Sequence, residues 1–195
     1  EQTSDAQFYS FNDKILSGSG GNNRYVTYNF STKKQTSIPL DDFHKKLRYK
    51  KNNHQVKIFH SRFKDKVFFA YENIPLIELQ GINQEKVFNS VILEKSKQEW
   101  VDANNKALSM RNDLFVAFND IQFHKGKLYL LYIGQYKKDI NPSTKSKVLV
   151  IDKNLKIESN IIFDHIVSQF LVKNEKIITY NPFDNKNSLK TYEIE

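Results

Sequence analysis

Short stretches of alternating apolar and polar residues dominate the chain, and one arrangement recurs four times. YSFNDKILSG (9–18), SRFKDKVFFAY (61–71), IQFHKGKLYLLY (121–132) and FLVKNEKIITY (170–180) each contain an apolar strand, a short polar turn, a lysine and a second β-rich strand. The recurring lysines are Lys14, Lys66, Lys127 and Lys176. Short strands joined by tight polar turns predict β-hairpins rather than helices. A hairpin that recurs at about 50 residues indicates a repeat architecture.

A second hairpin follows the first within each repeat. RYVTYNFSTKKQTSIPL (24–40) matches KVLVIDKNLKIESNIIF (147–163), and IPLIELQGINQEKVFNSVILE (74–94) is a looser copy. SLKTYEIE is the start of a fourth copy. The predicted unit is therefore four antiparallel strands, which is a propeller blade. We expect an all-β fold, with one β-propeller domain or fragment over residues 1–195 and blades at roughly 6–40, 55–94, 116–164 and 165–195.

The fourth predicted blade lacks its outer strand, and four blades alone make an unusually small ring. The first residues, EQTSD, are too short and polar to supply that strand. We therefore expect about four blades of a six-bladed ring, which missing N-terminal blades or a partner strand would complete. The alternative is a ring that closes in some other way.

The chain resembles the TolB-like six-bladed β-propeller family of Bacteroidota. The resemblance is carried by AYENIPLIEL, FNDIQFHKGKLYLLYIG, KVLVIDKNLKIESNIIFD and the closing IVSQFLVKNEKIITYN with LKTYEIE. It implies an exported protein in the periplasm or anchored to the outer membrane, often a lipoprotein of the cell envelope, and it supplies no catalytic residues. The chain differs from the family because it lacks the N-terminal blades and a lipid-bearing cysteine.

Composition and charge limit the kinds of site and partner that we expect. The absence of cysteine excludes disulfides, thiolate zinc sites and a cysteine nucleophile. No apolar run approaches the ~20 residues of a membrane helix. The net charge of +8 is compatible with an anionic partner. Most of it comes from scattered lysines rather than arginines, which suit phosphate recognition better, so we do not expect nucleic acid to be the partner.

No motif predicts a catalytic site, a cofactor or a metal. SGSGGNNR (17–24) precedes a predicted strand, whereas a phosphate loop needs a following helix. The five histidines have no metal-binding spacing, and DKN (152–154) suits a hairpin turn, where aspartate bonds its own backbone. No G-x-S-x-G motif marks a nucleophilic serine. The sequence leaves open whether the protein is an enzyme and favours a non-enzymatic role.

Two sets of residues are candidates for binding. The first set ends the second strands of the blades, which should gather on one ring face: Tyr71, Asn73, Tyr132, Gln135, Tyr136, Tyr180 and Asn181. Tyrosine and asparagine suit adaptable contacts, including sugar stacking, although aromatic residues at strand ends also serve packing. The second set lies in the basic segment 44–63, which is either an anion-contacting loop or a solvated connector: Lys45, Lys46, Arg48, Lys50, Lys51 and Arg62.

We therefore predict a non-catalytic, envelope-associated β-propeller that acts as a protein- or glycan-binding scaffold, with a rigid platform of blades and contacts made by loops. One alternative is a hydrolase or lyase with its site on a propeller face, which needs convergent carboxylates or a metal. A second alternative is a binder of an anionic polymer through the 44–63 segment, for which binding would depend steeply on salt.

Overall fold

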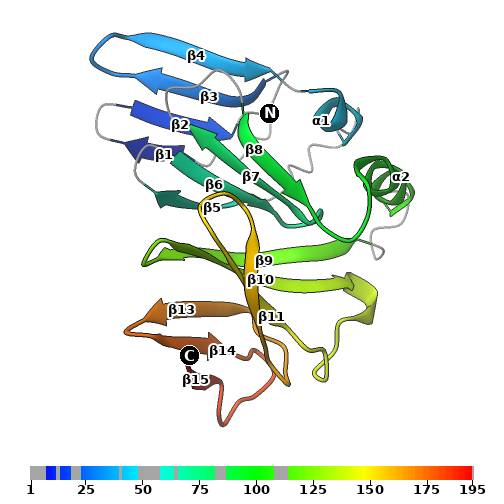
Figure 1. The fold of residues 1–195 in the computed structure, drawn as a ribbon. Coiled ribbons are helices and arrows are strands. Elements are labelled where there is room, and N and C mark those ends of the chain that lie inside the picture. Colours follow the sequence, from blue (N-terminus) through cyan, green and yellow to red (C-terminus); the bar gives the residue numbers. More distant parts are fainter. Residues whose placement is uncertain are drawn as a thin grey trace.

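The computed structural model describes residues 8–11, 14–18, 23–39, 41–47, 58–63, 66–81, 87–107 and 114–194. In this part of the chain, fifteen strands form four antiparallel sheets, and the strands of each sheet follow chain order. The first two sheets are β1 (Phe8–Phe11), β2 (Lys14–Gly18), β3 (Asn23–Asn29) and β4 (Lys34–Pro39), then β5 (Ile58–Phe63), β6 (Lys66–Tyr71), β7 (Leu76–Gly81) and β8 (Val87–Ile92). The last two are β9 (Phe115–His124), β10 (Lys127–Tyr136), β11 (Lys147–Ile151) and β12 (Ile157–Ile162), then β13 (Gln169–Lys173), β14 (Lys176–Tyr180) and β15 (Leu189–Glu193). Figure 1 shows the sheets following one another in chain order, from blue to red.

The repeated hairpins predicted from the sequence are confirmed. The recurring lysine starts the second strand of each sheet and pairs with the last residue of the first strand, as in Phe63↔Lys66 and His124↔Lys127. Both turn residues between β9 and β10, Lys125 and Gly126, have positive φ angles, of 45° and 84°. This is the geometry of a two-residue turn whose twist matches that of the strands it joins.

The sheets pack face to face through two hydrophobic clusters. The first cluster joins the first three sheets, and it contains Ile38, Phe68 and Leu128 from the first, second and third sheets. The second cluster joins the third and fourth sheets through residues such as Leu131 and Phe170. Every residue of β7 is buried because the second sheet has a neighbour on each face. Two of these buried residues, Glu78 and Gln80, are polar, and Glu78 Oε2 accepts a hydrogen bond from the Tyr71 hydroxyl.

The third sheet contacts the second and the fourth sheets chiefly through first strands. Strand β9 contacts both β5 and β13. Its polar side chains bond the backbone of β13: Asp120 Oδ2 accepts from Phe170 N at 3.2 Å, and Gln122 Oε1 accepts from Val172 N at 2.9 Å. Gln122 Nε2 also donates to Phe170 O at 2.5 Å. First strands that lie close together are expected of blades arranged around a common axis.

Replacing Gln122 with alanine should destabilise the junction between the third and fourth sheets. The change removes the partners of Val172 N and Phe170 O, and an unsatisfied buried backbone group costs about 1–3 kcal/mol. We expect the Val172 amide to exchange faster with deuterated solvent, measured by NMR. Gln169→Ala is the matched control, because Gln169 is exposed at the start of β13. Unchanged protection at Val172 in Gln122→Ala would contradict the assigned role.

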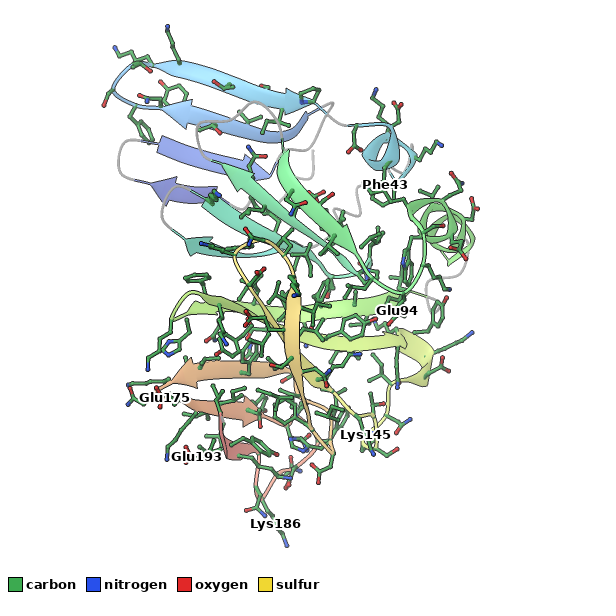
Figure 2. The ribbon with its side chains drawn as sticks, viewed as in Figure 1. Phe43, Glu94, Lys145, Glu175, Lys186 and Glu193 are labelled. Carbon is green, nitrogen blue, oxygen red and sulfur yellow. The ribbon has the colours of Figure 1, made fainter. Side chains whose placement is uncertain are left out.

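Two helices occupy connections between sheets and contact each other: α1 (Asp42–Leu47) and α2 (Lys97–Ala107). Helix α2 begins with a capping box, in which Ser96 N donates to Glu99 Oε2 at 2.8 Å and Ser96 Oγ accepts from Glu99 N at 3.3 Å. Trp100 anchors this helix, because its ring is buried 4.7 Å from the Phe115 ring and its Nε1 donates to Leu93 O. Across the helix pair, Lys97 Nζ lies 5.3 Å from the ring of Phe43, which is labelled in Figure 2. A short 3-10 helix, η1 (Lys137–Asp139), follows β10.

None of the described helices is long and apolar enough to cross a membrane.

Candidate functional site

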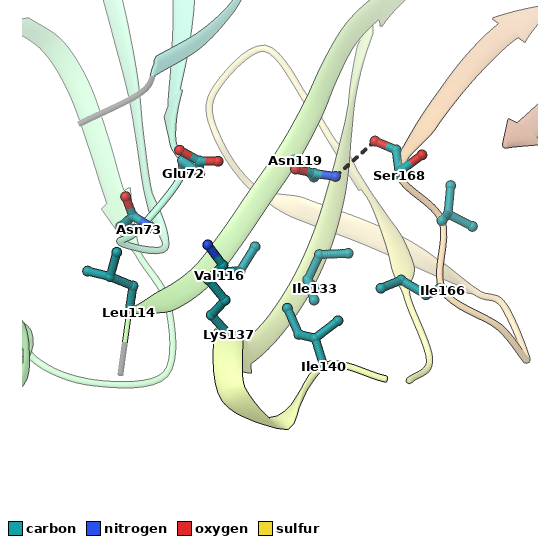
Figure 3. Close-up of a pocket in the computed structure, with 11 residues that line it drawn as sticks. Glu72, Asn73, Leu114, Val116, Asn119, Ile133, Lys137, Ile140, Ile166 and Ser168 are labelled. Carbon is teal, nitrogen blue, oxygen red and sulfur yellow. Dashed lines mark hydrogen bonds between the residues drawn. The ribbon is translucent and has the colours of Figure 1, made fainter. Parts of the chain in front are cut away.

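A pocket of about 440 Å³ opens where the second strands of the sheets end (Figure 3). Its walls come from the turn after β6, from β9 and the residue before it, from the end of β10 with the segment that follows, and from the connection between β12 and β13. The lining residues are Glu72, Asn73, Leu114, Val116, Asn119, Ile133, Lys137, Ile140, Ile166, Val167 and Ser168. Pockets that bind ligands have volumes of about 300–1,000 Å³ and mostly apolar linings, so this one is large enough to hold part of a partner molecule.

Hydrogen bonds between sheets fix the pocket walls. Ala117 N donates to Glu72 O at 2.6 Å, and Asn73 Nδ2 donates to Phe115 O at 3.0 Å, so the turn after β6 is attached to β9. On the other side, Asn119 Nδ2 donates to Ser168 O at 2.9 Å, the bond dashed in Figure 3. Hydrogen bonds between sheets therefore fix the walls on both sides of the pocket.

The pocket lining is aliphatic, and its two charged residues are Glu72 and Lys137. Six of the lining residues are valine, leucine or isoleucine, and none is aromatic. The lining supplies one carboxylate and one ammonium group, so it does not contain the pair of carboxylates on which much acid–base catalysis relies. In the part of the chain that the structure describes, no group of three or more His, Asp or Glu residues is placed to hold a metal ion. The chemistry that this arrangement supports is binding of an apolar group next to a charge.

Six of the seven predicted ligand-binding residues lie within two residues of the end of β6, β10 or β14, and Tyr132 lies earlier in β10. Figure 2 labels Glu94 and Lys145 on the right of the molecule and Glu175, in the turn between β13 and β14, on the left. Of the seven residues, Asn73 lines the pocket. Tyr71 is buried and donates to Glu78 Oε2 at 2.7 Å.

The other five predicted residues have packing roles or lie away from the pocket. Tyr132 is buried, donates to Glu94 Oε1 and has Lys147 Nζ 4.8 Å from its ring. Tyr136 is half-buried, with its ring 5.4 Å from that of Phe115. The remaining three are Gln135, half-buried beside Thr144, Asn181, buried and accepting from Phe183 N, and Tyr180, which is 41% exposed. A ligand-binding role for these residues stays a prediction.

The predicted anion-binding set is only partly described. Lys45 and Lys46 are exposed on α1, where Lys45 Nζ lies 3.4 Å from Asp42 Oδ1 and Lys46 donates to Gln98 Oε1 at 3.4 Å. Arg62 lies in β5, opposite Val67 of β6, and is therefore part of a sheet rather than of the connector. Arg48, Lys50 and Lys51 lie outside the described residues. Anion binding by this set also stays a prediction.

Sequence reasoning missed most of the pocket lining. It considered aromatic and amide residues at strand ends, whereas the pocket is formed by charged and aliphatic neighbours of those positions. Glu72 directly precedes the predicted Asn73, and Lys137 directly follows the predicted Tyr136. A search of every residue type at the ends of the second strands would have found Glu72 and Lys137. The aliphatic residues of the connection, Ile166 and Val167, carry no such signal.

A buried histidine supports the wall that Ile166 provides. The side chain of His165 is 8% exposed, and its Nδ1 lies 2.7 Å from Asp164 Oδ1. This hydrogen bond holds the pKa of the Asp164 carboxyl below its ordinary value. The Tyr192 ring stacks on His165 with ring centres 6.3 Å apart, and burial raises the pKa of Tyr192. These contacts hold the connection between β12 and β13 against the fourth sheet.

No protein-family model matches the chain, and no curated protein matches it. Solved structures do resemble it. A member of the DUF4221 family from Bacteroides vulgatus shares 10% identity over 96% of this chain and 63% of its own, with a TM-score of 0.56. BamB from Moraxella catarrhalis shares 7% identity over 96% of this chain and 43% of its own, with a TM-score of 0.54. BBS1N, solved in complex with ARL6DN, shares 11% identity over 93% of this chain and 47% of its own, with a TM-score of 0.52.

These likenesses concern the fold alone, since the identities are low. The chain spans less than two thirds of the length of each of these three structures. Together with the antiparallel sheets of the chain, they confirm the predicted fold class, a β-propeller with four-stranded blades. The finer resemblance to the TolB-like family and the number of blades in the ring stay predictions.

Proposed function

We propose that the protein is a non-catalytic propeller scaffold that binds another protein at the pocket between its second, third and fourth sheets. The aliphatic lining of this pocket carries the proposal. Sugars are commonly bound by stacking on aromatic rings, which the lining lacks, whereas aliphatic side chains of a protein fit an aliphatic pocket. The proposal therefore favours a protein over an oligosaccharide. The BBS1N structure is a complex with a second protein, so a chain of similar fold has a protein partner in that case.

We further propose that the fourth sheet packs against another sheet in a ring of about six blades. Cross-strand pairing places Leu171, Ile178, Tyr180 and Leu189 on the face of this sheet that points away from the third sheet. Leu171 is 46% exposed and Leu189 is 67% exposed. An apolar sheet face is normally covered, and in a propeller the neighbouring blade covers it. The resemblance to TolB-like propellers supports a place for this ring in the cell envelope.

Replacing Ile140 with serine should weaken the capture of a partner protein at the pocket. Ile140 lines the pocket and is only partly buried, so its loss removes apolar contact area without opening the main core. The wild-type protein would be used to capture partners from envelope fractions of cells that produce it, and each candidate would be purified and its affinity measured by calorimetry. We expect Ile140→Ser to weaken the affinity about tenfold, as for an apolar anchor residue.

Ile162→Ser is the matched control for this experiment. Ile162 is 66% exposed on β12 and lies outside the pocket lining. Its replacement should leave the affinity unchanged. Equal affinity of Ile140→Ser and the wild type for every purified partner would overturn the proposed binding face.

A further inference from the structure

The pocket rim carries the positive charge of Lys137, which forms no ion pair among the described residues. Lys137 is exposed at the rim, and no carboxylate of the described residues lies within ion-pair distance of its Nζ. The segment from Lys137 to Ser146 contains three lysines and one aspartate. A rim charge without an ion-pair partner among the described residues is available to a charge on a ligand, and such pairs guide the choice of partner more than they raise affinity.

The segment that carries this charge is held in place by hydrogen bonds. Asn141 N donates to Thr144 Oγ1 and Ser143 N donates to Asn141 Oδ1, both at 2.9 Å. At its end, Ser146 N donates to His165 O at 3.2 Å, and Ser146 Oγ accepts from Val167 N at 2.9 Å. At the other end of the segment, Lys137 N donates to Leu114 O at 2.7 Å. Because Leu114 and Val167 both line the pocket, these bonds hold the backbone of the segment beside the aliphatic lining.

Two asparagine side chains of the pocket walls offer hydrogen-bond acceptors to a ligand. Asn73 and Asn119 each use the side-chain nitrogen to donate to a backbone carbonyl of the protein. Their side-chain oxygens have no donor among the described residues. A ligand that satisfies them supplies N–H groups, and a polypeptide backbone in an extended conformation supplies such groups at regular spacing.

We propose that the pocket binds an extended, internal polypeptide segment in which a branched aliphatic residue follows an acidic residue. The aliphatic side chain enters the pocket, the acidic side chain pairs with Lys137, and backbone N–H groups donate to Asn73 and Asn119. This inference rests on the proposed function and names its ligand. The Lys137 ammonium favours an acidic residue beside it, and the aliphatic lining favours valine, leucine or isoleucine over an aromatic residue.

Fluorescence anisotropy with labelled synthetic peptides tests this ligand. The probe is acetyl-Gly-Ser-Asp-Ile-Ile-Ser-Gly-amide, and the comparison peptides replace Asp with Lys, replace both Ile with Ser, or end in a free carboxylate directly after Ile-Ile without the Asp. We expect the probe to bind about fivefold more tightly than the Lys peptide and about tenfold more tightly than the Ser peptide. Lys137→Glu should abolish the preference for Asp over Lys. Lys145→Glu changes the net charge equally but lies outside the pocket lining, and it should preserve that preference.

The outcomes separate this inference from the proposed function. Equal binding of the Asp and Lys peptides, with affinity still lost in Ile140→Ser, would overturn the acidic preference and leave the scaffold proposal in place. Tighter binding of the free-carboxylate peptide than of the probe would overturn the internal segment in favour of a chain terminus. Absence of binding by all peptides, while Ile140→Ser still weakens a captured partner, would overturn the ligand class alone. Failure of both experiments would overturn both proposals.

Discussion

Truncation of Phe68 to alanine is expected to lower the free energy of unfolding by about 3–5 kcal/mol. Phe68 lies in β6 with 0% exposure, and its ring stacks on that of Phe123 in β9 with ring centres 5.9 Å apart. The pair joins the second sheet to the third. Strands of both sheets surround the cavity that truncation would leave, and bonds such as Ala117 N to Glu72 O fix the positions of the two sheets relative to each other. Collapse into the cavity should therefore be limited, and the loss correspondingly large.

Urea unfolding followed by the fluorescence of Trp100, the single tryptophan of the chain, measures this loss. Phe30→Ala is the matched control, because Phe30 is 52% exposed and its ring contacts that of Tyr28 in the first sheet. The control should cost less than about 1 kcal/mol. Similar losses for the two variants would contradict a shared core between the second and third sheets. Since those sheets also form the pocket walls, Phe68→Ala should weaken partner binding as well.

The hairpins could be predicted from the sequence because their signals are local. A tight two-residue turn needs backbone conformations that few residues adopt, and the alternating strands on either side fix which residues pair. Asn174 and Glu175 in the turn between β13 and β14 have φ angles of 50° and 60°, and Lys173↔Lys176 is the pair that closes the hairpin. A lysine closes the corresponding pair in each repeat, so the sequence indicated the repeated sheets.

The candidate site could not be predicted in the same way because it depends on the spacing between sheets. Ile133 reads as one more apolar residue of a strand, and Ile140 as an isolated apolar residue in a polar segment. Tyr132 reads as a binding residue at a strand end, yet its hydroxyl donates to Glu94, which belongs to the connection after the second sheet. No pattern along the chain shows which distant segment fills the space beside a strand end. Tertiary contacts therefore determine which of these residues pack in the core and which line the pocket.

Replacing Gly134 with alanine is expected to lower the free energy of unfolding by about 2–5 kcal/mol, from backbone strain and overpacking together. Gly134 lies in a β-bulge of β10, between the pairs Tyr132↔Phe118 and Gln135↔Val116, and has a φ of +67°. An added Cβ would lie 2.9 Å from Tyr132 Cζ and still closer to Cε1. The Tyr132 ring cannot swing away freely, because it is 3% exposed and packed against Phe118.

Gly126→Ala separates the two causes, since Gly126 has a φ of +84° but open space where a Cβ would be. It should cost only the conformational strain, about 1–2 kcal/mol, and urea unfolding of both variants measures the difference. A second difference concerns the site. Ile133 precedes Gly134 in the same bulge and lines the pocket, so Gly134→Ala should also weaken binding of the Asp-Ile-Ile peptide, whereas Gly126→Ala, in a turn at the other end of the strand, should not. Equal effects of the two variants on stability and on peptide binding would show that the bulge neither tightens the core around Tyr132 nor positions Ile133 in the pocket wall.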